Sequence, residues 1–224
     1  MQKRNIIIDT YDTAAEGLWT LSAWELSAAE VQENYVNVPG HSGKLDLSTA
    51  LTDGEPYYNN REFEAILESS EGTRLEREER INQMINRLDG WRYNIVLPDD
   101  PLHYITGRVR VEKIYNDPVH ASVRVSATCN PWRYNKSETV VGLIAAETEQ
   151  TVALINNGRL SVVPRINVVG GTVRLKFTVG TEESSIALSP GEHTVADIYL
   201  KTGAFPLTYS GDGQITLTYR EAVL

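Results

Sequence analysis

The spacing of apolar residues is the feature that most restricts how this chain can fold. Beyond residue 90, apolar and polar residues alternate at a period of two, as at Val173, Leu175 and Phe177. This period is typical of strands with one buried face. A helical period of 3.6 is clear only in residues 74–89. The chain is therefore predicted to be mainly β, with one amphipathic helix.

Residues 74–89 carry their own helix start and stop signals. Thr73 and Glu76 have the three-residue spacing of a capping box. Apolar residues then recur from Ile81 at i, i+3, i+4 and i+7, and Gly90 suits the left-handed end of a helix. We expect the apolar stripe to pack on a sheet. Docking of a partner protein on this stripe is the less favoured alternative.

Charge is divided unevenly along the 224 residues and suggests two domains. The net charge is −9, but 13 basic and 21 acidic residues occur up to Trp132, against 8 and 9 after it. All four Trp residues also lie at or before Trp132. We therefore expect an N-terminal β-rich domain over 1–132 and a C-terminal β-sandwich over 133–224.

Turn signals divide the C-terminal part into about eight short strands, a pattern typical of a β-sandwich. Asn156-Asn157-Gly158 is predicted to be a hairpin turn, because Asn-Gly tolerates positive φ. A last hairpin is predicted around residues 210–213, and a strand over 194–200. In the N-terminal part, strands are predicted over 5–11 and 120–129, the second ending at Asn130-Pro131.

The acidic balance argues against a nucleic-acid reader, since binding a phosphate backbone depends on Lys and Arg. The first apolar run, Ile6 to Ile8, ends at Asp9 and is too short for a signal peptide. No apolar stretch reaches the length of a membrane span. We therefore expect synthesis in the cytoplasm and no membrane partner.

No motif predicts catalysis, a cofactor or a metal ion. Gly40 to Leu45 lacks the glycine and hydroxyl positions of a phosphate-binding loop. Cys129 lies in an alternating apolar run and is expected to be a buried small hydrophobe. Asp99 and Asp100 are adjacent on a predicted turn, and the four histidines are widely separated. The chain is therefore predicted not to be an enzyme.

A carbohydrate-binding module that attaches to a cell wall is one candidate function. Such sites usually stack sugars on aromatic faces, and no Trp lies beyond Trp132. Tyr199 and Tyr209 are the candidates for exposed aromatics, whereas Phe177 and Tyr219 alternate with aliphatic residues and are predicted to be core.

Six short motifs follow one another along nearly the whole chain. They are Pro39-Gly40 through Gly43 to Leu45-Asp46-Leu47-Ser48 and Gly54; Tyr57-Tyr58-Asn59-Asn60-Arg61; Asp99-Asp100 with Tyr104-Ile105-Thr106-Gly107-Arg108; Cys129-Asn130-Pro131-Trp132; Asn156-Asn157-Gly158 with Pro164-Arg165-Ile166-Asn167-Val168; and Tyr219-Arg220-Glu221-Ala222-Val223-Leu224. This series resembles the distal tail proteins (Dit) of long-tailed, non-contractile phages.

The resemblance implies a structural protein at the virion tail tip, made in the host cytoplasm. In that family the N-terminal domain forms a homo-hexameric ring, and the C-terminal domain is a galectin-like sandwich. The ring joins the tail tube protein to the tail-associated fibre or lysin protein and lets DNA pass as unbound cargo. It can also anchor receptor-binding proteins. Asp46, Arg61, Tyr104 and Arg108 occupy motif positions and are expected to order loops or line the oligomer interface. The last residues, about 219–224, are expected to pack back on the N-terminal domain. The alternative function is a carbohydrate-binding module that attaches a virion or an enzyme to the host cell wall.

Two further expectations follow from the resemblance. The C-terminal part contains no long insertion, so its sandwich is expected to lack a projecting arm of more than about ten residues. Some of the excess carboxylates of the N-terminal part are expected to line the ring's lumen and repel the DNA backbone.

Overall fold

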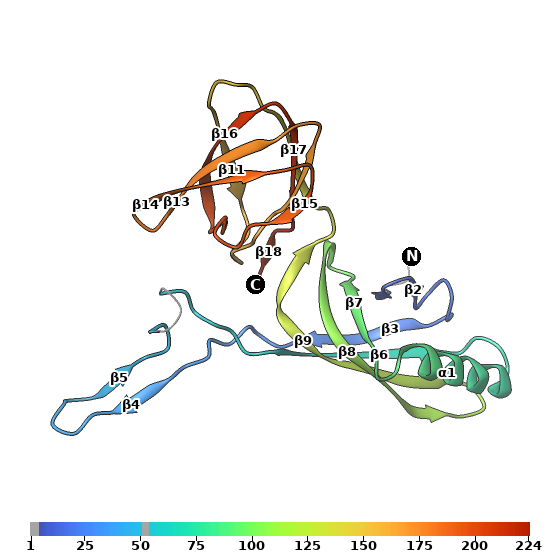
Figure 1. Cartoon of the computed structure of the whole chain (residues 1–224). Coiled ribbons are helices and arrows are strands. Elements are labelled where there is room, and N and C mark those ends of the chain that lie inside the picture. Colours follow the sequence, from blue (N-terminus) through green and yellow to red (C-terminus); the bar gives the residue numbers. More distant parts are fainter. Residues whose placement is uncertain (1–4, 51–53) are drawn as a thin grey trace. The chain divides into compact units, whose positions relative to one another are not determined.

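The computed structural model describes residues 5–50 and 54–224 of the chain (Figure 1). The expectation that the chain has no signal peptide concerns its N-terminal segment, of which residues 1–4 lie outside this description. The chain divides into two compact units, one ending at Arg133 and the other beginning at Tyr134. Strands dominate both units, and α1 is the single helix of the described residues. The prediction of a mainly β chain with one helix is therefore confirmed.

Unit 1 is built on one antiparallel sheet, with the strand order β2-β1-β7-β8-β9-β6-β3. Its long central strands are β8 and β9, and its edge strand β3 pairs with β6. The strands are β1 (Ile7–Ile8), β2 (Tyr11–Asp12), β3 (Thr20–Leu26), β6 (Arg61–Ser69), β7 (Arg92–Leu97), β8 (Asp100–Asn116) and β9 (Ala121–Asn135).

Helix α1 (Arg74–Leu88) begins and ends where the sequence predicts, to within one residue. Thr73 accepts a hydrogen bond from the Glu76 backbone N–H, and the Glu76 carboxylate accepts one from the Thr73 N–H. Gly90 has φ +82°, the left-handed conformation that ends the helix. Ile81, Met84 and Leu88 are buried in the core of the sheet. The expected packing of the stripe on a sheet is thus confirmed.

A buried arginine fixes the start of the helix to the turn between β8 and β9. Arg77 is only 1% exposed, and its guanidinium donates to the carbonyl oxygens of Gly72 and Asp117 and to the Asn116 side chain. A buried cation without such acceptors would be strongly unfavourable. The same contacts therefore determine where the β8–β9 hairpin ends.

Two strand predictions in unit 1 are wrong. The segment 5–11 is not one strand, because a turn at Asp9, with φ +50°, separates β1 from β2. Strand β9 does not end at Asn130-Pro131 but continues to Asn135. Proline lacks an N–H group, so it interrupts a ladder only where that group would have paired.

Unit 2 is a β-sandwich whose two four-stranded sheets share one apolar core. One sheet has the order β10-β17-β12-β15 and the other β11-β16-β13-β14. The strands are β10 (Thr139–Ile144), β11 (Gln150–Asn156), β12 (Arg165–Val169), β13 (Val173–Val179), β14 (Glu182–Leu188), β15 (Gly191–Thr194), β16 (Gly203–Gly211) and β17 (Gln214–Tyr219), followed by β18 (Ala222–Val223).

Residues 134–224, all of which the structure describes, carry no projecting arm. The longest connections between their strands are 157–164 and 195–202. The expectation of an armless sandwich is met. Phe177 and Tyr219 are 5% and 4% exposed, so the prediction that both are core residues is confirmed.

Three predictions within the sandwich are wrong because chain reversals move between sheets. Asn156-Asn157-Gly158 does not close a hairpin, since β11 pairs with β16 rather than with β12. Residues 210–213 likewise carry the chain from β16 in one sheet to β17 in the other. The strand predicted over 194–200 is instead β15, which ends at Thr194. Local turn chemistry does not distinguish a hairpin from a crossover.

Asn156 replaces the predicted hairpin with a buried polar junction. Its side chain is fully buried, and its amide nitrogen donates to the carbonyl oxygens of Leu160 and Leu200, each at 2.9 Å. Its oxygen accepts the Gly158 N–H at 2.9 Å. This side chain therefore supplies the pairing that strands do not provide in residues 157–164.

We expect Asn156→Ala to lower the free energy of unfolding of unit 2 by about 2–3 kcal/mol, because it leaves buried backbone groups without partners. Asn167→Ala is the matched control, since Asn167 is exposed on β12. Urea unfolding monitored by circular dichroism measures both variants. Equal stabilities of the two would contradict the structural role of Asn156.

Candidate assembly surfaces

A long hairpin connects β3 to β6, and its described residues, 27–50 and 54–60, are here called the arm (Figure 1). Its strands β4 (Tyr35–Asn37) and β5 (Lys44–Asp46) pair in a sheet of their own. Near the base, the Asn59 N–H donates to the Glu30 carbonyl and the Gln32 N–H to the Tyr57 carbonyl, both at 2.8 Å. Gly40 and Gly43, with φ +81° and +85°, form the turn at its tip. The arm is thus an ordered ladder.

The arm has no core of its own, since every residue from Val31 to Asp46 is exposed. Val36 lies directly opposite Leu45, and Asn37 lies opposite Lys44 on the next rung. Because strand side chains alternate, Val36 and Leu45 share an apolar face with Val38, whereas Asn37 and Lys44 share the polar face. The three apolar residues are 40–43% exposed. The arm therefore presents an apolar face to solvent within a single chain.

Arg61 lies at the base of the arm. It is 8% exposed, and its Nε donates to the Ser27 carbonyl at 2.7 Å. Ser27 also pairs with Glu62, the next residue of β6. The Ser27 N–H donates to the Glu62 carbonyl, and the Glu62 N–H donates to the Ser27 hydroxyl. Burial, with nearby Arg133, lowers the pKa of the Arg61 guanidinium. Arg61 therefore joins the two strands where they leave the sheet.

Asp46 lies on the exposed face of β5, opposite Tyr35. Its carboxylate accepts the Ser48 N–H at 2.9 Å, and hydrogen bonds from Ser48 lower the pKa of Asp46. The Ser48 hydroxyl in turn accepts the Asn34 N–H at 2.8 Å. Asp46 therefore organises the chain where β5 ends.

Tyr104 and Arg108 lie on β8, well separated in sequence from Asp46 and Arg61. Tyr104 is half-buried, whereas Arg108 is exposed and donates to the Gly90 carbonyl at the end of the helix. The four motif residues thus occupy two places, the arm with its base and strand β8. Whether any of them contacts a second chain stays a prediction.

The sheet face that points away from the core of unit 1 is densely charged. Strand β6 contributes Glu62, Glu64 and Glu68 to this open face, while Phe63, Ala65 and Leu67 point into the core. The charged residues of the open face are exposed except for half-buried Arg124. Its charged residues are Glu25, Glu62, Glu64, Glu68 and Glu112 with Arg92, Arg108, Arg110 and Arg124. The face is therefore mixed in charge, not purely acidic.

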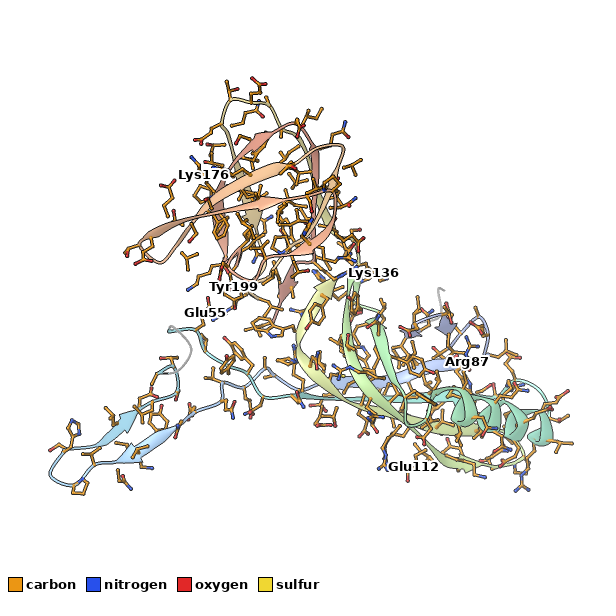
Figure 2. All side chains as sticks on the ribbon, in the orientation of Figure 1. Glu55, Arg87, Glu112, Lys136, Lys176 and Tyr199 are labelled. Atoms are coloured by element: carbon orange, nitrogen blue, oxygen red, sulfur yellow. The ribbon has the colours of Figure 1, made fainter. Side chains whose placement is uncertain are left out.

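Arg124 lies near the middle of the open face and bridges two strands. Its Nε lies 3.1 Å from a Glu64 oxygen on β6, and its Nη1 lies 3.1 Å from a Glu112 oxygen on β8. Figure 2 labels Glu112 on the side-chain view of this unit. These contacts show that the charged residues of β6 and β8 share one face.

The groups that resemble catalytic machinery have structural partners. Asp100 is bound by the His103 ring at 2.6 Å and by the Arg133 guanidinium at 3.0 Å. Cys129 is fully buried as predicted, and burial raises the pKa of its thiol to about 12. No cluster of three His, Cys, Asp or Glu side chains suited to a metal ion occurs among residues 5–50 and 54–224.

The aromatic residues of unit 2 give little support to a sugar site. Tyr209 is 9% exposed and belongs to the sandwich core, so it cannot stack on a ligand in this conformation. Tyr199 is 42% exposed and stays available (Figure 2). Of the two tyrosines expected to be exposed for sugar stacking, only Tyr199 is therefore exposed.

Comparison with known proteins identifies the fold. No family model and no curated protein matches the chain. Among solved structures, the crystal structure of the Dit protein (gp 19.1) of phage SPP1 matches it with a TM-score of 0.70 and 15% sequence identity. The match covers 98% of this chain and 99% of that chain. This chain has the Dit fold. SPP1 Dit is described as a paradigm of the hub adsorption apparatus in phages that infect Gram-positive bacteria.

The Dit fold accommodates both units described above, since the match extends over nearly the entire chain. Sequence reasoning found the family resemblance but missed the apolar face of the arm. The alternation of Val36 and Val38 before the turn, with Leu45 after it, was the available signal. None of the helices in the described residues combines the length and the apolar character needed to cross a bilayer.

We expect Cys129 to resist a disulfide-exchange reagent at pH 8 in the folded chain, because the thiolate is the reactive form and the raised pKa keeps the thiol protonated. One thiol per chain should react after denaturation in guanidinium, which provides the control. Absorbance of the released chromophore measures both. Rapid reaction of the folded chain would contradict this burial.

Proposed function

We propose that this chain is a structural hub protein of a phage tail tip, in which unit 1 assembles as a hexameric ring. The ring joins the tail tube to the tail-associated fibre or lysin protein and lets DNA pass as unbound cargo. The Dit fold across the whole chain supports a place in the virion tail. The Asp100 carboxylate is bound by side chains of the same chain and Cys129 is buried, which supports a role without catalysis.

The exposed apolar face of the arm is the observation that best supports assembly into a ring. An isolated two-stranded hairpin is marginally stable in water. This arm also exposes Val36, Val38 and Leu45 side by side. Contiguous exposed apolar side chains mark interaction surfaces. We therefore assign this face to a contact with a neighbouring copy in the ring.

A ring needs heterologous contacts, in which one patch meets a different patch on the next copy. The arm suits this requirement because it projects a surface far in sequence from the helix and the central strands of the sheet. Arg61 and Asp46 then have loop-ordering roles, since they fix the base of the arm and the end of β5.

The domain limits of the proposal are a ring-forming part over 1–132 and a galectin-like sandwich over 133–224. Receptor-binding proteins are proposed partners of the sandwich. Some carboxylates of the N-terminal part are proposed to line the lumen of the ring. If the open face lines the lumen, the lumen surface is mixed in charge, because four arginines share that face. Packing of residues 219–224 against the ring-forming part stays a prediction.

The mass of the assembly tests the proposal. We expect the full-length chain to form a species of six copies of the 25.0 kDa chain in light scattering coupled to gel filtration. The double variant Val36→Ser, Leu45→Ser should shift this species toward single chains. Burying a Val or Leu contributes about 1.5–3 kcal/mol, so losing both weakens each contact by more than about 100-fold.

Asn37→Ser with Lys44→Ser is the matched control, since these residues form the adjacent rung on the polar face. This variant should assemble as the unmodified chain does. A monomeric unmodified chain would overturn the ring. Equal assembly of both double variants would show that the arm does not carry the contact.

A further inference from the structure

Most charges of the open face are separated by strand; the exception is Glu112 of β8, which pairs with Arg124. On the β3–β6 side, the exposed charged residues are all acidic: Glu25, Glu62, Glu64 and Glu68. On the other side, β7 and the middle of β8 contribute Arg92, Arg108 and Arg110. We name the first set the acidic margin and the second the basic margin. Arg124 lies between them.

Each margin contains a like-charge pair at directly opposed positions. Glu25 on β3 lies opposite Glu64 on β6, and Arg92 on β7 lies opposite Arg108 on β8. Side chains directly opposite each other on neighbouring strands interact closely, so like charges there are destabilising. A single chain thus carries two repulsive pairs that an oppositely charged surface would stabilise.

The ion pairs within the chain do not compensate these margins. Glu64 has the Arg124 guanidinium as a partner, but the Glu25 side chain has no hydrogen bond or ion pair within the described part of the chain. Arg92 donates to the Asn130 side chain, and Arg108 to the Gly90 carbonyl. The Arg110 side chain has neither a hydrogen bond nor a salt bridge among the described residues. Both margins therefore keep unpaired charge.

The acidic margin also contains a hollow. It lies between β3 and β6 and is lined by Ala23, Trp24, Glu25, Glu64 and Ile66. The apolar lining suits the methylene stem of a long side chain, and the two carboxylates suit its charged end. An arginine guanidinium can donate two parallel hydrogen bonds to a carboxylate. The hollow thus has the chemistry of an arginine-binding site.

We propose that the hollow receives Arg110 from the neighbouring copy, so that the acidic margin of one chain meets the basic margin of the next. This inference rests on the proposed ring and names the residues that close it. Because the margins lie on different strands of one sheet face, separated by β9, head-to-tail contacts around a ring can satisfy both in every copy. Arg92 and Arg108 lie beside Arg110 and complement the remaining carboxylates.

Charge exchange in the full-length chain tests this contact. Glu25→Arg and Arg110→Glu should each abolish the ring at a concentration where the unmodified chain is fully assembled. A chain carrying both changes should recover it, because each interface again pairs Arg with Glu. Glu183→Arg is the control, since Glu183 is exposed on β14 of unit 2 and makes the same change in charge. Light scattering coupled to gel filtration reports all four.

Glu25→Gln provides a second readout that does not depend on charge reversal. Removing one member of the Glu25–Glu64 pair relieves repulsion within the chain. Thermal unfolding of the dissociated chain should therefore occur at the same or a higher temperature, while the dissociation constant of the ring rises at least tenfold. A general structural role of Glu25 would lower both stabilities together.

The outcomes separate this inference from the proposed ring. A ring that forms and survives both single exchanges, or that the paired exchange fails to restore, overturns the Glu25–Arg110 contact and leaves the ring in place. A monomeric unmodified chain overturns both. Loss in each single variant with recovery in the paired variant supports both.

Discussion

The register between β6 and β9 is the constraint on which unit 1 depends. Nine consecutive pairs run from Arg61 opposite Cys129 to Ser69 opposite Ala121. This register places Phe63 with Ala127 on the core side and the glutamates of β6 on the other. A slip by one residue would exchange the two faces and bury the charges. The core and the charged open face are thus two results of one pairing.

On its other side β9 pairs with β8, and this second pairing explains a glycine at the centre of the sheet. A Cβ at Gly107 would lie 2.5 Å from the Cys129 Sγ and 2.9 Å from the Thr128 carbonyl oxygen. The backbones of β8 and β9 therefore approach closely only because Gly107 has no side chain. Gly107 belongs to the Tyr104–Arg108 motif that carries the family resemblance, so one element of that motif has a packing reason.

The two proposed contacts between copies use different physics. The arm offers a small apolar face, which favours association without selecting a direction. The margins of the open face offer opposite charges, which select the partner surface and its orientation more than they add affinity. An assembly that uses both contacts would combine a non-directional attraction with a charge pattern that specifies the neighbour. Screening by salt weakens the second contact more than the first.

Much of the fold could be predicted from the sequence, because its signals are local. The capping box at Thr73 and the apolar stripe of α1 lie within a few turns of each other, and alternation marks most strands. The order of short motifs gave the Dit resemblance, and the comparison of folds agrees. The candidate site residues were harder to predict from the sequence, since Glu25 and Glu64 become neighbours only when β3 pairs with β6.

By itself, the sequence determined most of the strand segments, where the helix begins and which side chains are buried in the two cores. Only the tertiary structure decided which strands are neighbours. Asn156-Asn157-Gly158 has the local chemistry of a hairpin turn, yet the partner of β11 is β16, about fifty residues later in the chain. Turn propensity acts over a few residues, whereas strand pairing is chosen by the packing of the whole core.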